Sequence, residues 1–105
     1  MTDFTIDETA RGDAVALSLS GDLDMSATFA LEPVLDRVLA DPPRELVLDL
    51  DDVDIVDSSG LSLLIATNER AARAEVDMAI TGAGPQIQRV FHIAGLDGIL
   101  PVRGT

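Results

Sequence analysis

Two periodicities of apolar residues alternate along the 105 residues of this chain, and this alternation restricts its fold more than any other feature. Apolar residues occupy every second position over 15–19 and 76–80, which is the pattern of a β-strand. They recur at helical spacing over 27–38 and 61–72. Strand patterns that alternate with helical patterns predict β-α-β units and therefore a parallel sheet.

Shorter segments complete the predicted order of elements. Residues 4–6 predict an edge strand, and the turn at 11–13 joins it to the next strand as a hairpin. The nearly continuous apolar run over 46–50 predicts a central strand that is covered on both faces. A short helix over 87–94 and a last strand over 99–102 follow. The order β-β-α-β-α-β-α-β predicts an α/β fold with a mixed, mostly parallel sheet packed with helices.

The start of the first helix is the least regular part of this pattern. Residues 21–24 are expected to end the second strand, and Ser26 or Thr28 is a candidate N-cap. Pro33 lies inside the helical pattern, where proline removes a hydrogen bond and clashes with the preceding turn. We therefore expect this helix either to begin late, near 29–32, or to be kinked.

Composition indicates one globular domain over 1–105. Hydrophobic residues make up 47% of the chain, which argues against disorder. Cysteine is absent, which excludes disulfides, Cys-zinc sites and thiol catalysis, and His92 is the single histidine. No apolar run approaches the ~20 residues of a membrane span, and the N-terminus has no basic region of a signal peptide. We expect a cytoplasmic protein without membrane insertion.

The charge balance restricts the partners of this chain. Seven basic residues, all arginine, stand against 19 acidic residues, which gives a net charge of −12. Such a chain is repelled by nucleic-acid phosphates and by anionic lipid, so nucleic acid is not an expected partner. An electropositive protein suits the charge better, although net negative charge also serves solubility alone.

The segment over 48–61 carries the most chemical information. It consists of a buried strand, an acidic loop expected over 51–57, and then Ser58-Ser59-Gly60 at the start of a helix. Ligands of open α/β sheets bind beyond the carboxyl ends of the strands, and a helix N-terminus favours anions. A phosphate on Ser58 or Ser59 would be stabilised there. A serine in this place is also an ordinary N-cap, and both interpretations remain open.

Three catalytic or metal-binding interpretations of this segment fail on residue type. A phosphate-binding loop needs several glycines and a lysine, but the segment contains only Gly60 and the chain has no lysine. A calcium loop that starts at Asp49 needs glycine at its sixth position, where Asp54 stands. A serine hydrolase would need His92 as its base and a Gly-x-Ser-x-Gly turn that is absent. We expect no catalytic residue, no metal and no cofactor.

The same segment carries a family resemblance. The sequence Asp-Ser-Ser-Gly-Leu at 57–61, after a Leu-Asp-Leu strand, resembles the signature of STAS domains, and most of all that of stand-alone anti-sigma-factor antagonists. The sequence Gly-Asp-Leu-Asp at 21–24 is similar to the Gly-Glu-Leu-Asp of the family. Residues 90–96 are similar to its late Leu-Phe-x-x-x-Gly-Leu helix end. The resemblance extends over nearly the whole chain and implies a single STAS domain.

This resemblance implies a phosphorylation switch in a protein that is not an enzyme. The unphosphorylated protein would bind an anti-sigma factor, often a serine kinase, and so release a sigma factor. The kinase would phosphorylate Ser58, with Ser59 and Ser62 as alternative acceptors, and a phosphatase would reverse the reaction. The general base, the Mg²⁺ and the nucleotide would belong to the partner.

The resemblance also implies a surface for the partner. Its expected residues surround the acceptor serine: Asp22, Asp24, Asp57, Ser59, Gly60 and Leu63. Asp57 would orient the loop or the incoming Mg²⁺–phosphate, or simply form a turn, and Ser59 is a candidate for the true N-cap. Asp24 would contact the partner or cap the turn before the first helix. Gly60 would let a partner backbone approach closely or merely fit the first helical turn. Leu63 is a candidate exposed contact, because it falls outside the inner stripe expected for its helix, which consists of Leu61, Leu64, Ile65, Asn68 and Ala72.

Two other functions of STAS domains remain compatible with the sequence. One is a subunit that docks on a transporter ATPase in a lipid-trafficking complex through the same helix end, without phosphorylation. The other is a small nucleotide-binding module. The absence of lysine, of a glycine-rich loop and of a stacking aromatic residue near Ser58 disfavours the second function.

Overall fold

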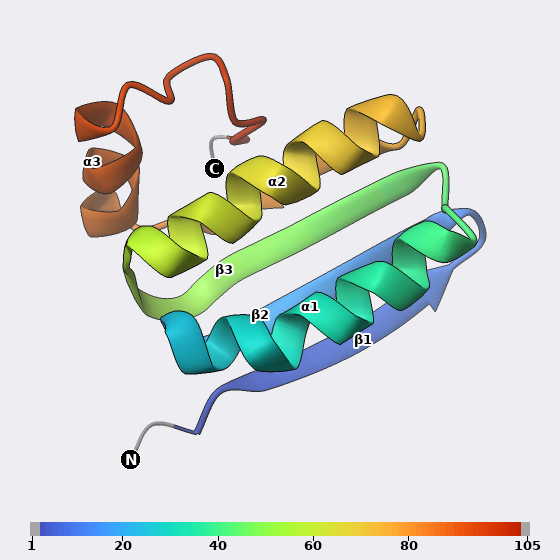
Figure 1. Ribbon diagram of the computed structural model, residues 1–105, viewed down its shortest axis with the longest axis horizontal. Helices are drawn as coiled ribbons and strands as arrows, with labels where there is room; N and C mark the ends of the chain where they lie inside the picture. Colours follow the sequence, from blue (N-terminus) through green and yellow to red (C-terminus); the bar gives the residue numbers. More distant parts are fainter. Residues whose placement is uncertain (1–2, 104–105) are drawn as a thin grey trace.

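A mixed four-stranded sheet carries the fold over residues 3–103, the part of the chain that the computed structural model describes (Figure 1). The elements follow in the order β1 (Thr5–Arg11), β2 (Ala14–Leu23), α1 (Met25–Ala40), β3 (Glu45–Val56), α2 (Ser58–Arg73), β4 (Asp77–Thr81) and α3 (Pro85–Ile93). The strands are ordered β1-β2-β3-β4 in space. β1 pairs antiparallel with β2, and the other neighbours are parallel, so the predicted mixed, mostly parallel α/β sheet is confirmed.

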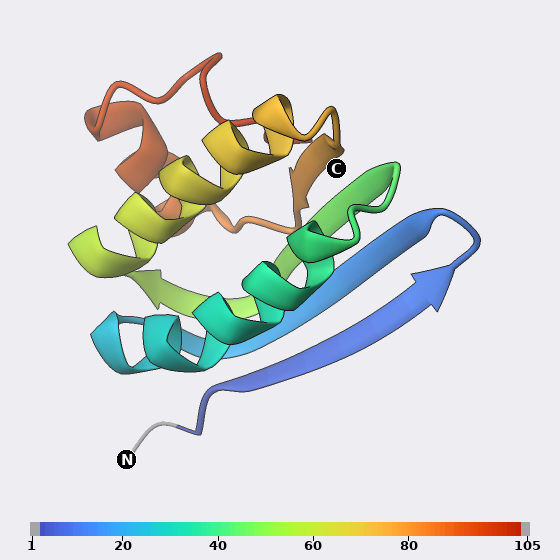
Figure 2. The same cartoon turned by 45° about the vertical axis from the view of Figure 1, so that its right-hand side comes forward.

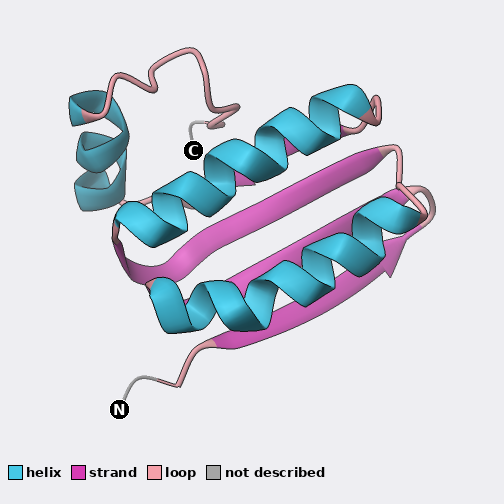
Figure 3. Cartoon of the chain, in the orientation of Figure 1, coloured by secondary structure: helices cyan, strands magenta, loops and turns pink. Residues whose placement is uncertain are grey.

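Helices α1 and α2 lie side by side over the same face of the sheet (Figures 1 and 2). The strand residues below them form the core, with Leu17 and Leu19 from β2 and Leu48 and Leu50 from β3 all buried. Figure 3 shows that no helix of the described chain covers the opposite face of the sheet. The predicted cover on both faces of β3 is therefore wrong. Its alternate positions, such as Val47, are only half-buried, as in a sheet with one solvated face.

The acidic segment predicted as a loop over 51–57 is mostly strand, because β3 continues to Val56. β2 also continues beyond its predicted end, to Leu23. The pairing of the two strands shifts between Ser18 and Ser20 and again between Gly21 and Asp22. Each shift adds one residue on the β3 side, as a β-bulge does, and so breaks the period of two. The broken alternation is the reason why the sequence pattern indicated a loop.

Helix α1 begins at Met25 and runs to Ala40 with Pro33 inside it. The predicted late start is therefore wrong, and so are the predicted N-caps Ser26 and Thr28, because Asp24 caps the helix. Pro33 is exposed, so its ring meets solvent instead of the sheet. The lost hydrogen bond to the carbonyl of residue 29 is the local cost of this proline.

The end of the chain only partly follows the prediction. The strand expected over 99–102 is reduced to a single parallel bridge between Val102 and Ile80. The Ile80 N–H donates to the Pro101 carbonyl at 2.9 Å, and the Arg103 N–H donates to the Ile80 carbonyl at 2.8 Å. Gly95, with φ +73°, follows α3 and allows the left-handed turn that ends it. Within the described residues no helix is both long and apolar enough to cross a membrane.

Candidate functional site

The predicted site lies where α1 and α2 begin, at the edge of the sheet where the parallel strands β2 and β3 end (Figure 1). The two helix starts have the same local structure. An oxygen of the Asp24 carboxylate accepts the Ala27 N–H at 3.0 Å, and an oxygen of the Asp57 carboxylate accepts the Gly60 N–H at 3.0 Å. Each aspartate satisfies one of the backbone donors that a helix leaves free at its N-terminus.

A tight backbone contact joins the two helix starts. The Asp57 N–H donates to the Leu23 carbonyl at 3.2 Å. Gly60 packs against the same residue, and a Cβ at position 60 would lie 2.3 Å from the Leu23 carbonyl oxygen and 2.8 Å from its Cγ. Gly60 is buried, so the structure favours its role in the first helical turn over direct contact with a partner backbone. The N-cap and first turn of α2 are therefore packed against the end of β2.

The serines differ in their position on α2. Ser58 is the first residue of the helix and is exposed, Ser59 is half-buried, and Ser62 is exposed. The predicted N-cap Ser59 is wrong, because Asp57 has the extended backbone of an N-cap and makes the capping hydrogen bond. The cap thus leaves the Ser58 hydroxyl free of that role. The first hydrogen bond along the helix backbone runs from the Leu61 N–H to the Asp57 carbonyl at 2.9 Å.

Carboxylates surround this edge of the sheet. The Ala27 N–H and the Ser26 hydroxyl both donate to the Asp24 carboxylate and hold its pKa below the ordinary value. Asp22 pairs with Ile55 across the ends of β2 and β3, and the exposed Asp57 follows directly on β3. The structure therefore brings Asp22, Asp24 and Asp57 to one edge, beside the first turn of α2. Within the described residues no group of three carboxylate or histidine side chains could hold a metal ion.

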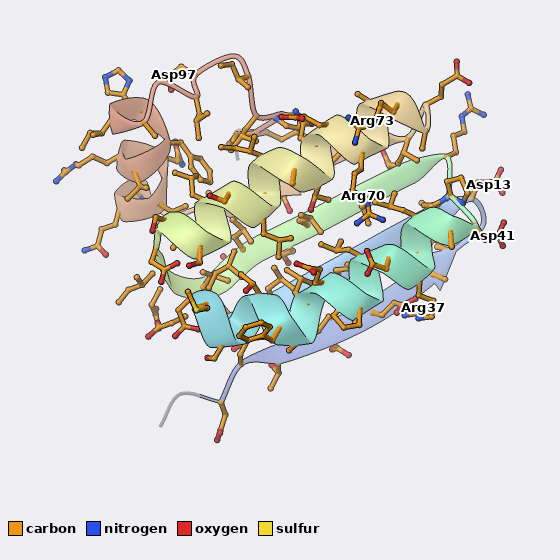
Figure 4. The ribbon with its side chains drawn as sticks, in the orientation of Figure 1. Asp13, Arg37, Asp41, Arg70, Arg73 and Asp97 are labelled. Atoms are coloured by element: carbon orange, nitrogen blue, oxygen red, sulfur yellow. The ribbon has the colours of Figure 1, made fainter. Side chains whose placement is uncertain are left out.

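Leu63 lies in a different place from the predicted one, whereas His92 is exposed on the helix that was predicted over 87–94. Leu63 is half-buried and packs against the core, so it is not the exposed contact that its spacing predicted. His92 lies on α3 and pairs with Asp97 of the following turn (Asp97 is labelled in Figure 4). Both side chains line a hollow of about 760 Å³ between α3 and the segment that follows it.

The described part of the chain thus presents an exposed serine at a capped helix start, with carboxylates beside it, on an α/β domain. Residues 6–101 match the family described as "Mlab, STAS domain". The chain belongs to the STAS domain family.

Relatives of this chain include named regulators. The anti-sigma-F factor antagonist RsfB of Mycobacterium tuberculosis is 33% identical over 94 residues, which cover 90% of this chain and 76% of RsfB. The crystal structure of an anti-sigma factor antagonist from Mycobacterium paratuberculosis is 34% identical, with a TM-score of 0.88, and the match covers 98% of this chain and 87% of the other. The structure of the Bacillus cell fate determinant SpoIIAA in the phosphorylated form has a TM-score of 0.74 at 16% identity, over 97% of this chain and 92% of SpoIIAA. This last match shows the fold alone.

Proposed function

We propose that this protein is an anti-sigma-factor antagonist, which is a binding protein and not an enzyme. Phosphorylation of Ser58 switches its binding off. The unphosphorylated form binds an anti-sigma factor with serine-kinase activity and thereby releases a sigma factor. The names of the two mycobacterial relatives support the class of function. The observation that carries the switch is the exposed Ser58 at the first position of α2, where Asp57 already caps the helix.

The phosphoryl transfer needs only a hydroxyl from this chain. The Ser58 oxygen attacks the γ-phosphorus of ATP held by the kinase, a new O–P bond forms, and the bond to the bridging oxygen of ADP breaks. The hydroxyl proton goes to a base of the kinase, and a phosphatase later hydrolyses the phosphoserine. Mg²⁺ and the base belong to the partner, which agrees with a site built from one serine and aspartates of the capping type.

Exposure and helix position favour Ser58 over the alternative acceptors. Ser59 is half-buried, which restricts access to a kinase. Ser62 is exposed but lies beyond Leu61, where backbone N–H groups are already engaged along the helix. A phosphate on Ser58 meets free backbone donors and the positive end of the α2 dipole.

The switch acts through charge at the interface and leaves the fold unchanged. A phosphate adds about −1.5 to −2 charge beside Asp24 and Asp57. The helix N-terminus of this chain tolerates that charge, whereas a partner packed against Ser58 would have to desolvate it without a counter-charge. Disrupting a buried polar contact at an interface costs about 2–5 kcal/mol. That loss weakens binding by roughly 30-fold to several thousand-fold.

The test compares Ser58→Ala with Ser58→Asp as baits in lysates of the source organism, with mass spectrometry of the bound proteins. We expect the alanine form to retain an anti-sigma factor with a kinase domain and the aspartate form to lose it. The matched control is Thr9→Asp, which adds the same charge at an exposed hydroxyl residue of β1, away from the start of α2, and should bind like the wild type. Equal recovery of a transporter ATPase by both Ser58 forms would contradict the switch and support the alternative STAS function.

A further inference from the structure

The outward face of α1 is divided into two halves of different character. Met25, Phe29 and Pro33 are spaced four residues apart and therefore lie in one line along the helix. All three are exposed, Met25 to 59% and Phe29 to 74%. Leu31 and Leu35, on the inner side of the same helix, are fully buried. We call Met25, Phe29 and Pro33 the α1 stripe.

The second half of the outward face is charged, and its charges are already paired within the protein. Asp36 accepts a hydrogen bond from Arg70 of α2 at 2.8 Å, and Arg37 pairs with Glu8 of β1. Figure 4 shows Arg37 and Arg70 toward the far ends of their helices. The exposed apolar side chains on the outward face of α1 are thus confined to the half of the helix that begins at the predicted site.

The α1 stripe starts beside the N-cap and first turn of α2. Met25 directly follows Asp24, the N-cap of α1. Leu23, which precedes Asp24, accepts the Asp57 N–H with its carbonyl and packs against Gly60. Phe29 lies about 6 Å further along the helix at 1.5 Å per residue. A partner that contacts Ser58 and the two capping aspartates therefore reaches Phe29 within one more helical turn.

We propose that the α1 stripe is the second half of the docking face and that the anti-sigma factor covers it with an apolar groove rimmed by basic side chains. This inference rests on the proposed function. Single exposed apolar residues are ordinary, but three in line beside a recognition site form a continuous strip. Aromatic side chains that insert into a partner supply much of the affinity at interfaces. The flanking carboxylates of Asp24 and the exposed Glu32 call for a basic rim.

A second copy of this chain is a poorer occupant for the same surface. Each copy carries a net charge of −12, and two such acidic edges would repel each other when they meet. The docking face therefore suits a partner of opposite charge better than a symmetric dimer.

The test is Phe29→Ala, with Ile93→Ala as the matched control. Ile93 is 78% exposed on α3, so both substitutions remove a large exposed apolar side chain and keep a good helix former. The affinity of each variant for the purified anti-sigma factor is measured by calorimetry, beside wild type and Ser58→Asp. We expect Phe29→Ala to weaken binding at least tenfold, Ile93→Ala to change it less than twofold, and both to unfold at the wild-type midpoint.

The outcomes separate this inference from the proposed function. If Phe29→Ala binds like wild type while Ser58→Asp does not bind, the proposed docking role of the α1 stripe is wrong and the proposed switch at Ser58 is supported. If wild type and Ser58→Asp bind equally, or neither binds, the proposed function fails and the inference with it. Sedimentation of the protein alone provides a further test, because a lower mass of Phe29→Ala than of wild type would identify a second copy as the occupant and overturn the inference.

Discussion

Gly60 shows at the scale of one residue how the fold positions Ser58, the proposed phosphoacceptor. The position it occupies has no room for a side chain, because the Leu23 carbonyl lies 2.3 Å from where a Cβ would stand. Backbone cannot yield as a flexible side chain can, so any larger residue must displace either the start of α2 or the end of β2. Ser58 lies only two residues before this contact.

We expect Gly60→Ala to destabilise the protein by about 1–3 kcal/mol, as other forced insertions into packed sites do. Urea unfolding measures the loss. Gly84→Ala is the matched control, because Gly84 caps α3 with a negative φ and nothing lies within 4 Å of its Cβ position. Its cost should stay below about 1 kcal/mol, the effect of a less favourable N-cap residue. Equal losses in the two variants would contradict the packing role of Gly60.

The sequence could not decide between neighbouring residues of similar chemistry. Asp57 and Ser59 are both good N-caps, and only the extended backbone of Asp57 makes it the cap. Gly60 could likewise either contact a partner backbone or fit the first helical turn. The choice depends on its packing against Leu23, which lies 37 positions earlier in the chain. The motif at 57–61 marks the segment in which Asp57 caps α2 and Ser58 is exposed, but the local roles of its residues depend on the packing of β2.

At the scale of elements, the strand and helix patterns were predicted well and their faces less well. The buried side of α2 carries Gly60, Leu64, Thr67 and Ala71, where apolar spacing predicted Leu61, Leu64, Ile65, Asn68 and Ala72. Thr67 is buried because its hydroxyl donates to the Leu63 carbonyl at 2.7 Å and so needs no partner outside the helix. A helix that buries small and self-satisfied polar residues does not show its inner face in hydrophobic spacing alone.

The start of α1 depends on a charged cap, and this makes its stability sensitive to pH. The hydrogen bonds from Ala27 and Ser26 lower the pKa of Asp24 from its ordinary value of 3.8. Because the pKa of Asp24 is lower in the folded state, its carboxylate contributes to the free energy of unfolding at any pH above the pKa of the unfolded state. This contribution is lost as the pH falls through the pKa of the folded state. Asparagine caps helices as well as aspartate does but does not titrate.

We therefore expect the stability of wild type relative to Asp24→Asn to be constant from about pH 5 to 7 and to decline below about pH 4. Thermal unfolding followed by far-UV circular dichroism at several pH values measures the difference between the two proteins. Parallel curves over the whole range would show that the Asp24 carboxylate is not the titrating cap. The other 18 acidic residues are common to both proteins, so the difference isolates this one group.

At the scale of the whole molecule, the arginines and the predicted site lie at different ends. Arg11 and Arg44 lie where the parallel strands begin, and Arg37, Arg70 and Arg73 lie near the ends of α1 and α2 (Figure 4). Arg103 pairs with Glu45 at the start of β3, which leaves Arg89 on α3 as the exception. Positive charge therefore offsets the acids of the far end, while the carboxylates around Ser58 remain without nearby arginine partners from α1 and α2.

This distribution predicts that association with a basic partner is steered by charge. The association rate should fall as salt rises, because charges are screened beyond about 10 Å at 0.1 M ionic strength. Stopped-flow mixing with the anti-sigma factor at several salt concentrations gives the slope of the rate against ionic strength.

The double variant Asp22→Asn with Asp54→Asn removes two charges at the site end of the strands and should flatten this slope. Asp13→Asn with Asp41→Asn removes two charges at the far end, labelled in Figure 4, and should change it much less. Equal flattening by both pairs would mean that the total charge of −12 governs the encounter and that its placement around Ser58 does not.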